Sequence, residues 1–340
     1  MPARASRENR PDLGKTGTAM MSGIVRVTTP SRLHFGLLAF GDPSVPQFGG
    51  VGVMIDRPGV RITLTAASEL ELSGPLEERV RSATLAWARV HAGGSMPRCR
   101  VVVERAAPLH VGLGTGTQLA LAVAAGLSAL AGLPRPSPEA LAHTAGRGRR
   151  SAVGTYGFAL GGLIAELGKP DDQALAPLYR RIALPAAWRF VLIRPTRGSG
   201  LCGAQEDEMF RQLPPVASQL TSKLVEEMDQ HLLPAAEAGD IDAFGESLYH
   251  YGATAGGCFA ACQGGPFADA RLDQWVATIR QLGVRGVGQS SWGPTLFALL
   301  ASPEDARRFV LQFRDVVAEA DATLTIAAVD NAGAVITGPA

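Results

Sequence analysis

The chain has 340 residues, 46% of them hydrophobic, and 32 basic residues nearly balance 31 acidic ones, which leaves a formal charge of +1. This length exceeds one ordinary hydrophobic core and predicts two domains. Because the charge is close to zero, nothing global favours binding to nucleic acid or to a membrane surface. The longest apolar run, 119–131, is shorter than the roughly 20 residues that span a bilayer, so we expect neither kind of partner.

The four cysteines are few and scattered. Cys99, Cys202, Cys258 and Cys262 include no C-x-x-C pair and form no disulfide pattern. This use of cysteine is typical of a reduced compartment and predicts a cytoplasmic protein. Cys258 and Cys262 lie four residues apart and could share a helix face as metal ligands, although buried free thiols are the commoner alternative.

The first part of the chain predicts a tail followed by strands and one helix. Residues 1–21 combine Arg, Pro, Gly and Thr without periodicity, which predicts a disordered tail without the apolar stretch of a secretory signal. Ordered structure is expected near Ile24, where apolar and polar residues begin to alternate as in a half-buried strand. Strands are predicted over 24–29, 51–55, 60–66 and 100–104, and a helix over 76–91.

The pattern then changes twice along the chain. The apolar run predicts a buried helix, and a Pro-rich turn leads to a second helix over 138–145. Beyond these we predict a strand over 189–195, two or three helices within 205–281, a strand over 295–300, a helix over 303–320 and a closing strand over 322–329. Strands and helices do not alternate strictly, which favours the α+β class. We place an N-terminal domain at 22–186 and a C-terminal domain at 187–340.

The segment HVGLGTGT, residues 110–117 and hereafter the first glycine loop, lies directly before the buried helix. Glycines leave backbone N–H groups exposed, and the first turn of a helix adds unpaired donors and a partial positive charge. Such a junction favours phosphate, and Thr115 and Thr117 could donate hydroxyl groups or contact a magnesium ion held by the phosphates. The spacing matches neither the Walker A nor the Rossmann pattern. A tight strand-to-helix turn is the alternative.

Two further segments carry basic residues among small or apolar ones. In PSRLHFGLL, residues 30–38, Arg32 and His34 would project from one face of a strand and could hold an anion; a solvated arginine beside a structural histidine is the alternative. In GRGRRSAVGTYGFALGG, residues 146–162, three arginines stand among glycines, which suits forked recognition of phosphate or carboxylate. A basic surface loop is the alternative there.

The segment GVGQSSWGP, residues 286–294 and hereafter the second glycine loop, carries Ser290, Ser291 and Trp292 before an apolar strand. A hairpin turn would explain its glycines. It would not explain an aromatic side chain flanked by hydroxyl groups, so we expect this loop to contact a ligand.

Together these four segments resemble the GHMP superfamily of small-molecule kinases, whose P-x-x-x-G-L-G-S-S loop corresponds to Pro108 through Gly114 and the residues that follow. The segments SRLHFGL, GLGTGTQLALAVA, GRGRRSAVGTYGF and GQSSWGPT are more similar to one branch, the β-ribofuranosylaminobenzene 5′-phosphate synthases. The resemblance runs from about Ile24 to near the end of the chain. The four motifs are specific only in combination.

The resemblance implies a fold and a reaction. It implies an N-terminal domain like ribosomal protein S5 domain 2, a ferredoxin-like C-terminal domain, a site in the cleft between them and a homodimer. The implied reaction is an enzymatic phosphoribosyl transfer, in which 4-aminobenzoate condenses with phosphoribosyl pyrophosphate and carbon dioxide and pyrophosphate are released, in the biosynthesis of tetrahydromethanopterin-type carriers. Inversion at the anomeric carbon requires no covalent enzyme nucleophile. Mg²⁺ is implied with the ribosyl donor, and no organic cofactor.

The resemblance also suggests roles for the residues singled out above. Pyrophosphate would be held by Gly112, Gly114, Thr115, Gly116, Thr117, Gln118 and Arg147. His34, Arg32 and Arg149 are the expected catalytic residues, with Ser151 a weaker candidate. Arg32 and His34 would face the benzoate carboxylate or the 5-phosphate, and Arg149 would take the remaining anion together with Arg147. Ser290, Ser291 and Trp292 would close over the aminobenzoate, with the indole as a flat face. Thr117 would contact the metal, and Asp56 is a weaker metal candidate or a structural acid at a strand end.

Two other functions stay open. An ATP-dependent kinase of a small alcohol would use the same loop, but many such kinases carry an acid in the segment before the glycine pair that corresponds to Gly161 and Gly162. Residues 151–160 contain no Asp or Glu, so a kinase of that type would lack its general base. A non-catalytic relative that binds a phosphate ligand is the second alternative, and the arginines that it would not need are present.

Overall fold

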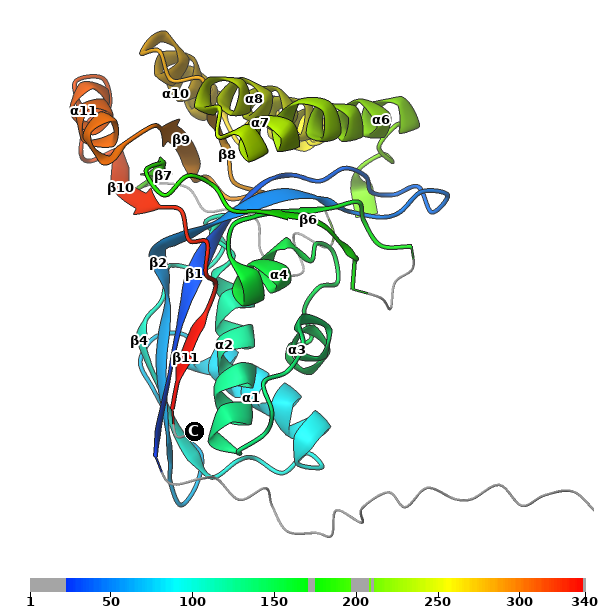
Figure 1. Cartoon of the computed structure of the whole chain (residues 1–340), viewed down its shortest axis with the longest axis vertical. Helices are drawn as coiled ribbons and strands as arrows, with labels where there is room; N and C mark the ends of the chain where they lie inside the picture. The colour runs from blue at the N-terminus through cyan, green and yellow to red at the C-terminus, as the bar shows by residue number, and fades with distance from the viewer. Residues whose placement is uncertain (1–22, 171–174, 197–207, 209–210, 339–340) are drawn as a thin grey trace, which may run out of the picture.

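The computed structural model describes residues 23–170, 175–196, 208 and 211–338. Residues 261 and 262 are described by their backbone alone. The tail expected at 1–21 lies outside the described residues, as does Cys202. In the described residues, two sheets and their helices occupy the two ends of an elongated molecule (Figure 1).

The first sheet has seven strands, in the order β11-β1-β2-β4-β3, with β5 paired to β2 and β6 paired to β5. Its strands are β1 (Ile24–Gly36), β2 (Gly50–Ala66), β3 (Glu71–Ser73), β4 (Cys99–Arg105), β5 (Leu163–Glu166), β6 (Leu178–Ile182) and β11 (Val335–Thr337). The long antiparallel pair β1 and β2 is interrupted by register shifts beside Pro30 and between His34 and Gly36. Beyond these shifts the two strands reach the other half of the molecule (Figure 1).

Four helices cover one face of the first sheet (Figure 1). They are α1 (Glu77–His91), α2 (Thr115–Leu130), α3 (Pro138–Ala145) and α4 (Val153–Leu160). Helix α2 is apolar on nearly all sides, which is typical of a helix with no solvent-facing side. It packs against the sheet and against α1, α3 and α4. The first glycine loop therefore ends at the start of the central helix of the domain.

The second sheet is antiparallel and has the order β10-β7-β9-β8. Its strands are β7 (Arg189–Pro195), β8 (Val287–Gln289), β9 (Leu296–Leu300) and β10 (Ala322–Ala328), and its helices are α6 (Ser218–Glu227), η1 (Met228–Leu232), α7 (Leu233–Ala238), α8 (Ile241–Gly257), α9 (Ala260–Gln263), α10 (Ala270–Gln281) and α11 (Pro303–Arg314). Val191 and Ile193 of β7 pack into a core with α10 and α11. Phe190 and Leu192, on the other face, join a core shared with the first sheet.

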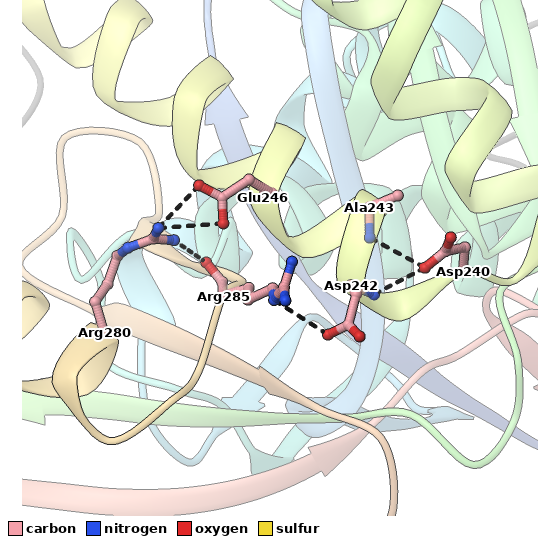
Figure 2. A network of polar contacts seen from close by, with 6 residues as sticks. All are labelled: Asp240, Asp242, Ala243, Glu246, Arg280 and Arg285. Carbon is pink, nitrogen blue, oxygen red and sulfur yellow. Dashed lines mark hydrogen bonds and ion pairs between the residues drawn. The ribbon is translucent and has the colours of Figure 1, made fainter.

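A polar network fixes α8 beside α10 and the segment that leads into β8 (Figure 2). Asp240 accepts hydrogen bonds from the N–H groups of Asp242 and Ala243 and thereby caps α8. Arg280 of α10 donates to both carboxylate oxygens of Glu246 at 2.8 and 3.1 Å and to the carbonyl of Arg285 at 2.8 Å. These contacts hold the segment directly before the second glycine loop against α8.

The α+β prediction is confirmed, and most predicted elements are present. The strands expected at 51–55 and 60–66 are one strand, because the Arg57–Pro58 and Gly59 positions bend β2 without ending its pairing with β1. Helix α4 and the strands β3, β5, β6, β8 and β11 were not predicted from the sequence, and the described part of 205–281 holds more helices than the two or three predicted. The last of these strands returns to the first sheet beside β1, so the end of the chain rejoins the N-terminal half.

Candidate active site

A cavity of about 400 Å³ lies where the two halves meet. Its lining comes from β1, the first glycine loop, the segment before α4, helix α8 and the second glycine loop. All four motifs singled out in the sequence therefore contribute to one cavity.

The two glycine loops touch each other at one edge of the cavity. Gly112 has φ +88°, and a Cβ atom there would stand 2.3 Å from the carbonyl oxygen of Ser290; one on Gly293 would stand 2.1 Å from the nitrogen of Gly112. Only glycine permits this approach of backbone to backbone. The N–H of Arg32 also donates to the carbonyl of Leu113 at 3.1 Å, so the first loop is bound to β1 as well.

The first glycine loop delivers the N-terminus of α2 to the cavity. Gly114 occupies the N-cap position with φ +69°, and no side chain caps the helix. Gly114, Thr115, Gly116 and Thr117 line the cavity. An uncapped N-terminus presents unpaired N–H groups and a partial positive charge, which suits an anion.

The cavity is lined by five arginines and by no Asp or Glu among the described residues; the arginines are Arg32, Arg79, Arg147, Arg149 and Arg150. The Nε atom of Arg147 is buried and has no hydrogen-bond partner among the described residues. Burial, followed by the repulsion of Arg79 and Arg149, lowers the pKa of Arg147. An unpartnered guanidinium nitrogen within a cluster of like charges is suited to an anionic ligand.

The C-terminal half contributes aromatic and small side chains. The rings of Phe259 and Trp292 lie 4.2 Å apart, centroid to centroid, and both line the cavity. Phe40 stacks behind Phe259 at 5.2 Å. None of the described lining residues between 252 and 293 carries a charge. Trp292 thus stands where the sequence placed an aromatic face, and Phe259 is an aromatic wall that the sequence analysis missed.

His34 is held by hydrogen bonds at both ring nitrogens. Its Nδ1 accepts from the N–H of Gly36 at 3.3 Å, so the hydrogen of the neutral ring lies on Nε2, which donates to Ser151 Oγ at 3.1 Å. Burial, followed by the positive charge of Arg32, lowers the pKa of His34 well below its usual value, so the ring is neutral at pH 7. His34 lines the cavity, but its nitrogens are used within the protein.

Glu166, at the end of β5, was not among the residues predicted from the sequence. Its carboxyl group accepts from the N–H of Ala152 at 2.8 Å and forms a hydrogen bond with the Ser151 side chain. Burial raises the pKa of Glu166 to about 7, against the lowering effect of these hydrogen bonds and of Arg32. The signal in the sequence is a lone acid in the otherwise apolar strand LIAE, which directly follows the glycine pair at 161 and 162.

Three predicted site residues lie elsewhere. The buried hydroxyl group of Ser290 donates to the carbonyl of Gly112 at 2.6 Å and accepts from the N–H of His34 at 3.0 Å, so we assign it to joining the loops instead of binding aminobenzoate. The Nε2 atom of Gln118 donates to the carbonyl of Gly154 at 2.9 Å, beneath the cavity lining. Asp56 accepts from Ala328 and pairs with Arg57 outside the cavity, because β10 packs beside it there. These contacts favour the structural acid over the metal ligand for Asp56.

The residues present offer magnesium few ligands. No group of three His, Cys, Asp or Glu side chains suited to a metal occurs in the described part of the chain. Thr117 is the predicted metal ligand that lines the cavity. Mg²⁺ is bound in many phosphate sites mainly by waters and substrate phosphates. The site therefore fits a metal that arrives bound to a phosphate ligand, with Thr117 as a protein contact, and does not fit an all-protein metal cage.

Two cysteines, Cys99 and Cys258, have side chains that the structure describes. Cys99 and Cys258 are free, and burial raises the pKa of Cys99 to about 12 and also raises that of Cys258. The structure does not describe the side chain of Cys262. That Cys258 and Cys262 share a helix face as metal ligands therefore stays a prediction. Within the described ranges, no helix combines the length and the apolar character that crossing a membrane requires.

Comparison with known proteins identifies the family. The model of the GHMP kinases N terminal domain matches residues 79–162, and the model of the GHMP kinases C terminal region matches residues 232–319. The homoserine kinase of Cytophaga hutchinsonii has a similar structure, with a TM-score of 0.67 at 16% identity, over 94% of this chain and 98% of the kinase. At this identity, the likeness supports the two-domain fold alone.

Two curated proteins are similar in sequence over most of the chain. The β-ribofuranosylphenol 5′-phosphate synthase of Methanothermobacter thermautotrophicus is 29% identical over 80% of this chain and 88% of its own length. The synthase of the same name from Archaeoglobus fulgidus is 28% identical over 87% of this chain and 93% of its own length. The chain therefore belongs to the GHMP superfamily, as an α+β enzyme similar to its β-ribofuranosylphenol 5′-phosphate synthases.

Proposed function

We propose that this enzyme is a β-ribofuranosylaminobenzene 5′-phosphate synthase, which joins the ribosyl 5-phosphate of phosphoribosyl pyrophosphate to the ring of 4-aminobenzoate. The reaction releases pyrophosphate and carbon dioxide and supplies a precursor of tetrahydromethanopterin-type carriers. The similarity to the two curated synthases supports this assignment. Their names specify a phenol product, and a para hydroxyl group donates electrons to the ring as a para amino group does.

The observation that carries the proposal is the division of the cavity. Its charged lining consists of arginines of the N-terminal half, next to the uncapped start of α2, whereas the C-terminal half contributes Phe259 and Trp292 without charge. A phosphorylated sugar and an aromatic acid fit these two kinds of surface. The synthase reaction requires both ligands in one cavity.

The proposed reaction needs no enzyme nucleophile and no net proton transfer. The ring carbon that bears the carboxylate attacks the anomeric carbon, and the bond from that carbon to the pyrophosphate oxygen breaks with its electron pair leaving on pyrophosphate. The bond to the carboxylate then breaks, its electron pair restores the aromatic ring, and carbon dioxide leaves. The enzyme must align the two reactants and stabilise the departing charge.

The residues divide these tasks in our proposal. The first glycine loop and the start of α2 hold the pyrophosphate, with Arg147 as a neighbouring cation. Arg32 and Arg149 neutralise the 5-phosphate and the benzoate carboxylate, and the face of Trp292 orients the ring. Thr117 would be the protein contact of an Mg²⁺ ion held by the pyrophosphate, and such an ion would supply charge neutralisation. We also propose a homodimer and a cytoplasmic location, which light scattering and cell fractionation test.

The test is identification of the product. The enzyme is incubated with phosphoribosyl pyrophosphate, Mg²⁺ and either 4-aminobenzoate or 4-hydroxybenzoate, and the products are analysed by mass spectrometry. We expect a decarboxylated ribosyl-arene 5-phosphate with at least one of the two acids. Its absence with both acids, from protein that binds pyrophosphate, contradicts the proposal.

A parallel reaction with ATP and small alcohols tests the kinase alternative. None of the described cavity-lining residues is a carboxylate, and Glu166 lies behind Ser151, so a general base for an alcohol is missing at the cavity surface. We expect no alcohol phosphorylation. Binding without turnover in every reaction would instead favour a non-catalytic relative.

A further inference from the structure

A buried chain of three side chains leads from Glu166 to the cavity. Glu166 accepts from the N–H of Ala152 at 2.8 Å, which places its carboxyl group beside the Ser151 hydroxyl group, and Ser151 Oγ lies 3.1 Å from Nε2 of His34. Glu166 has no exposed surface, whereas Ser151 is half-buried and lines the cavity. None of the steps of the proposed reaction uses this carboxyl group.

The hydrogen bonds around Ser151 determine where its hydroxyl hydrogen points. Oγ accepts from Nε2 of His34 and, at 3.2 Å, from the N–H of Val153, which Glu166 shares. A hydroxyl group accepts about two hydrogen bonds and donates one. With both acceptor positions used, the hydrogen goes to the ionised Glu166 and none is left for a ligand. When Glu166 is protonated, its carboxyl group is a weaker acceptor, and the Ser151 hydroxyl group can rotate its hydrogen toward the cavity.

The surroundings make Glu166 sensitive to charge. Its second oxygen, Oε2, is buried without a hydrogen-bond partner among the described residues. Arg32 on β1 and Ser151 before α4 face it, and neutral His34 lies on the other side of Ser151. Its charge also acts on Tyr156 of α4 and Tyr251 of α8, two neutral phenols whose pKa burial raises further. Arg32 is thus the positive charge that faces the carboxylate.

We propose that Glu166 is a positioning residue whose carboxyl group takes up a proton when the anionic ligand binds, which frees the Ser151 hydroxyl hydrogen for a phosphate oxygen of that ligand. The entering phosphates draw on the charge of Arg32 and repel the carboxylate across a poorly screened interior. Protonation of Glu166 removes this repulsion and adds one donor to the site. That the ligand is the ribosyl donor rests on the proposed function. The coupling of Glu166 to the binding of a phosphate or pyrophosphate group does not depend on it.

Pyrophosphate binding tests this coupling without turnover. Isothermal calorimetry at pH 7.5 in two buffers of different ionisation enthalpy gives the number of protons taken up on binding. The same measurement on the Glu166→Gln variant gives the baseline, which is the number of protons that pyrophosphate itself exchanges. We expect the wild-type protein to take up at least about half a proton more than the variant. From pH 6.5 to 8.5, wild-type affinity should fall about tenfold relative to the variant, because the ionised carboxylate opposes binding and is absent from Gln.

A merely structural Glu166 would change affinity by the same factor at every pH. Parallel pH profiles, or equal proton uptake in the two proteins, therefore overturn the proposal. Glu104→Gln, on the exposed face of β4, is the matched control and should follow the wild-type profile.

If Glu166→Gln does not fold, a second variant still tests the proposal. Ser151→Ala removes the hydroxyl group and should lower pyrophosphate affinity about tenfold at pH 6.5 and less at pH 8.5, where the wild-type hydrogen is held by Glu166. An equal loss at both pH values contradicts the switch. Failure of pyrophosphate to bind contradicts the inference, whereas binding without any ribosyl-arene product contradicts only the proposed function.

Discussion

At the scale of single residues, the cavity gathers positive charge, because its described lining holds five arginines and no Asp or Glu. Arg147 shows this most plainly, because its Nε atom is buried and unpartnered among the described residues and its neighbours Arg79 and Arg149 repel it. Such an arrangement costs free energy in the absence of a ligand and repays it when an anion binds. The arginines are thus expected to act on affinity for the phosphorylated substrate.

Replacement Arg147→Met tests that role. It keeps most of the apolar stem and removes the charge, so the KM for phosphoribosyl pyrophosphate should rise about 10- to 100-fold, as for loss of a charged hydrogen bond. Steady-state kinetics measure this change. Arg100→Gln is the control: Arg100 lies on the exposed face of β4 and pairs with Glu71 of β3, and its replacement should leave the KM unchanged. An unaltered KM in Arg147→Met would show that this arginine does not contact the donor.

Glu166 makes a separate prediction for stability. An unfolded glutamate titrates near pH 4.3, whereas burial raises the pKa of Glu166 to about 7 in the folded protein. Between these pH values the folded state binds more protons than the unfolded state. The contribution of protonated Glu166 to the free energy of unfolding is therefore complete below pH 4.3 and is lost as the pH rises through 7. From pH 5 to pH 8, Glu166→Gln should therefore gain about 1–3 kcal/mol in free energy of unfolding relative to wild type. Urea titrations at the two pH values measure it, and a constant difference would contradict it.

At the scale of elements, the site depends on two loops whose backbones touch. The sequence predicted the first glycine loop and helix α2 because glycine spacing and an apolar run are local signals. Helix α4 was missed because Gly154 and Gly157 are poor helix formers, and it forms in contact with α2, β1 and β2. Glu166 was missed because antiparallel pairing of β5 with β2, not proximity in sequence, brings it near His34.

Gly112→Ala tests the contact between the loops. Its Cβ atom would stand 2.3 Å from the carbonyl oxygen of Ser290 at φ +88°, so the loop must move away from the second glycine loop. We expect synthase activity to fall at least about 100-fold, since small displacements of reacting groups cost that much. Gly93→Ala, also at positive φ but with nothing within 4 Å of the new Cβ, is the control and should cost only about 1 kcal/mol of stability. Equal activity in the two variants would contradict the account.

At the scale of the whole molecule, the two halves are joined through the site itself. A single hydrophobic core includes Phe35 of β1, Phe190 of β7 and Phe297 of β9, and Tyr251 of α8 donates to the carbonyl of Gly36 at 3.2 Å. Ser290 adds a polar joint by contacting both Gly112 and His34. These contacts join residues more than 170 positions apart, and no local pattern reveals such pairings. Ser290 was for that reason predicted to bind a ligand.

Ser290→Ala tests the joint. Loss of two buried hydrogen bonds should lower the free energy of unfolding by about 1–3 kcal/mol and raise the KM for the ribosyl donor, because the first glycine loop loses an anchor. Ser128→Ala removes another buried hydrogen bond, from Trp87 at 3.0 Å, away from the cavity. It should cost similar stability and leave the KM unchanged. A normal KM in Ser290→Ala would contradict the role of the joint.

The most direct test of the central claim is release of labelled carbon dioxide from carboxyl-labelled 4-aminobenzoate or 4-hydroxybenzoate, with pyrophosphate measured in the same reaction. We expect release only when phosphoribosyl pyrophosphate is present, with one carbon dioxide for each pyrophosphate, and we expect Arg149→Ala to abolish it. Pyrophosphate release without carbon dioxide, or no release of either from folded protein, would contradict the synthase function.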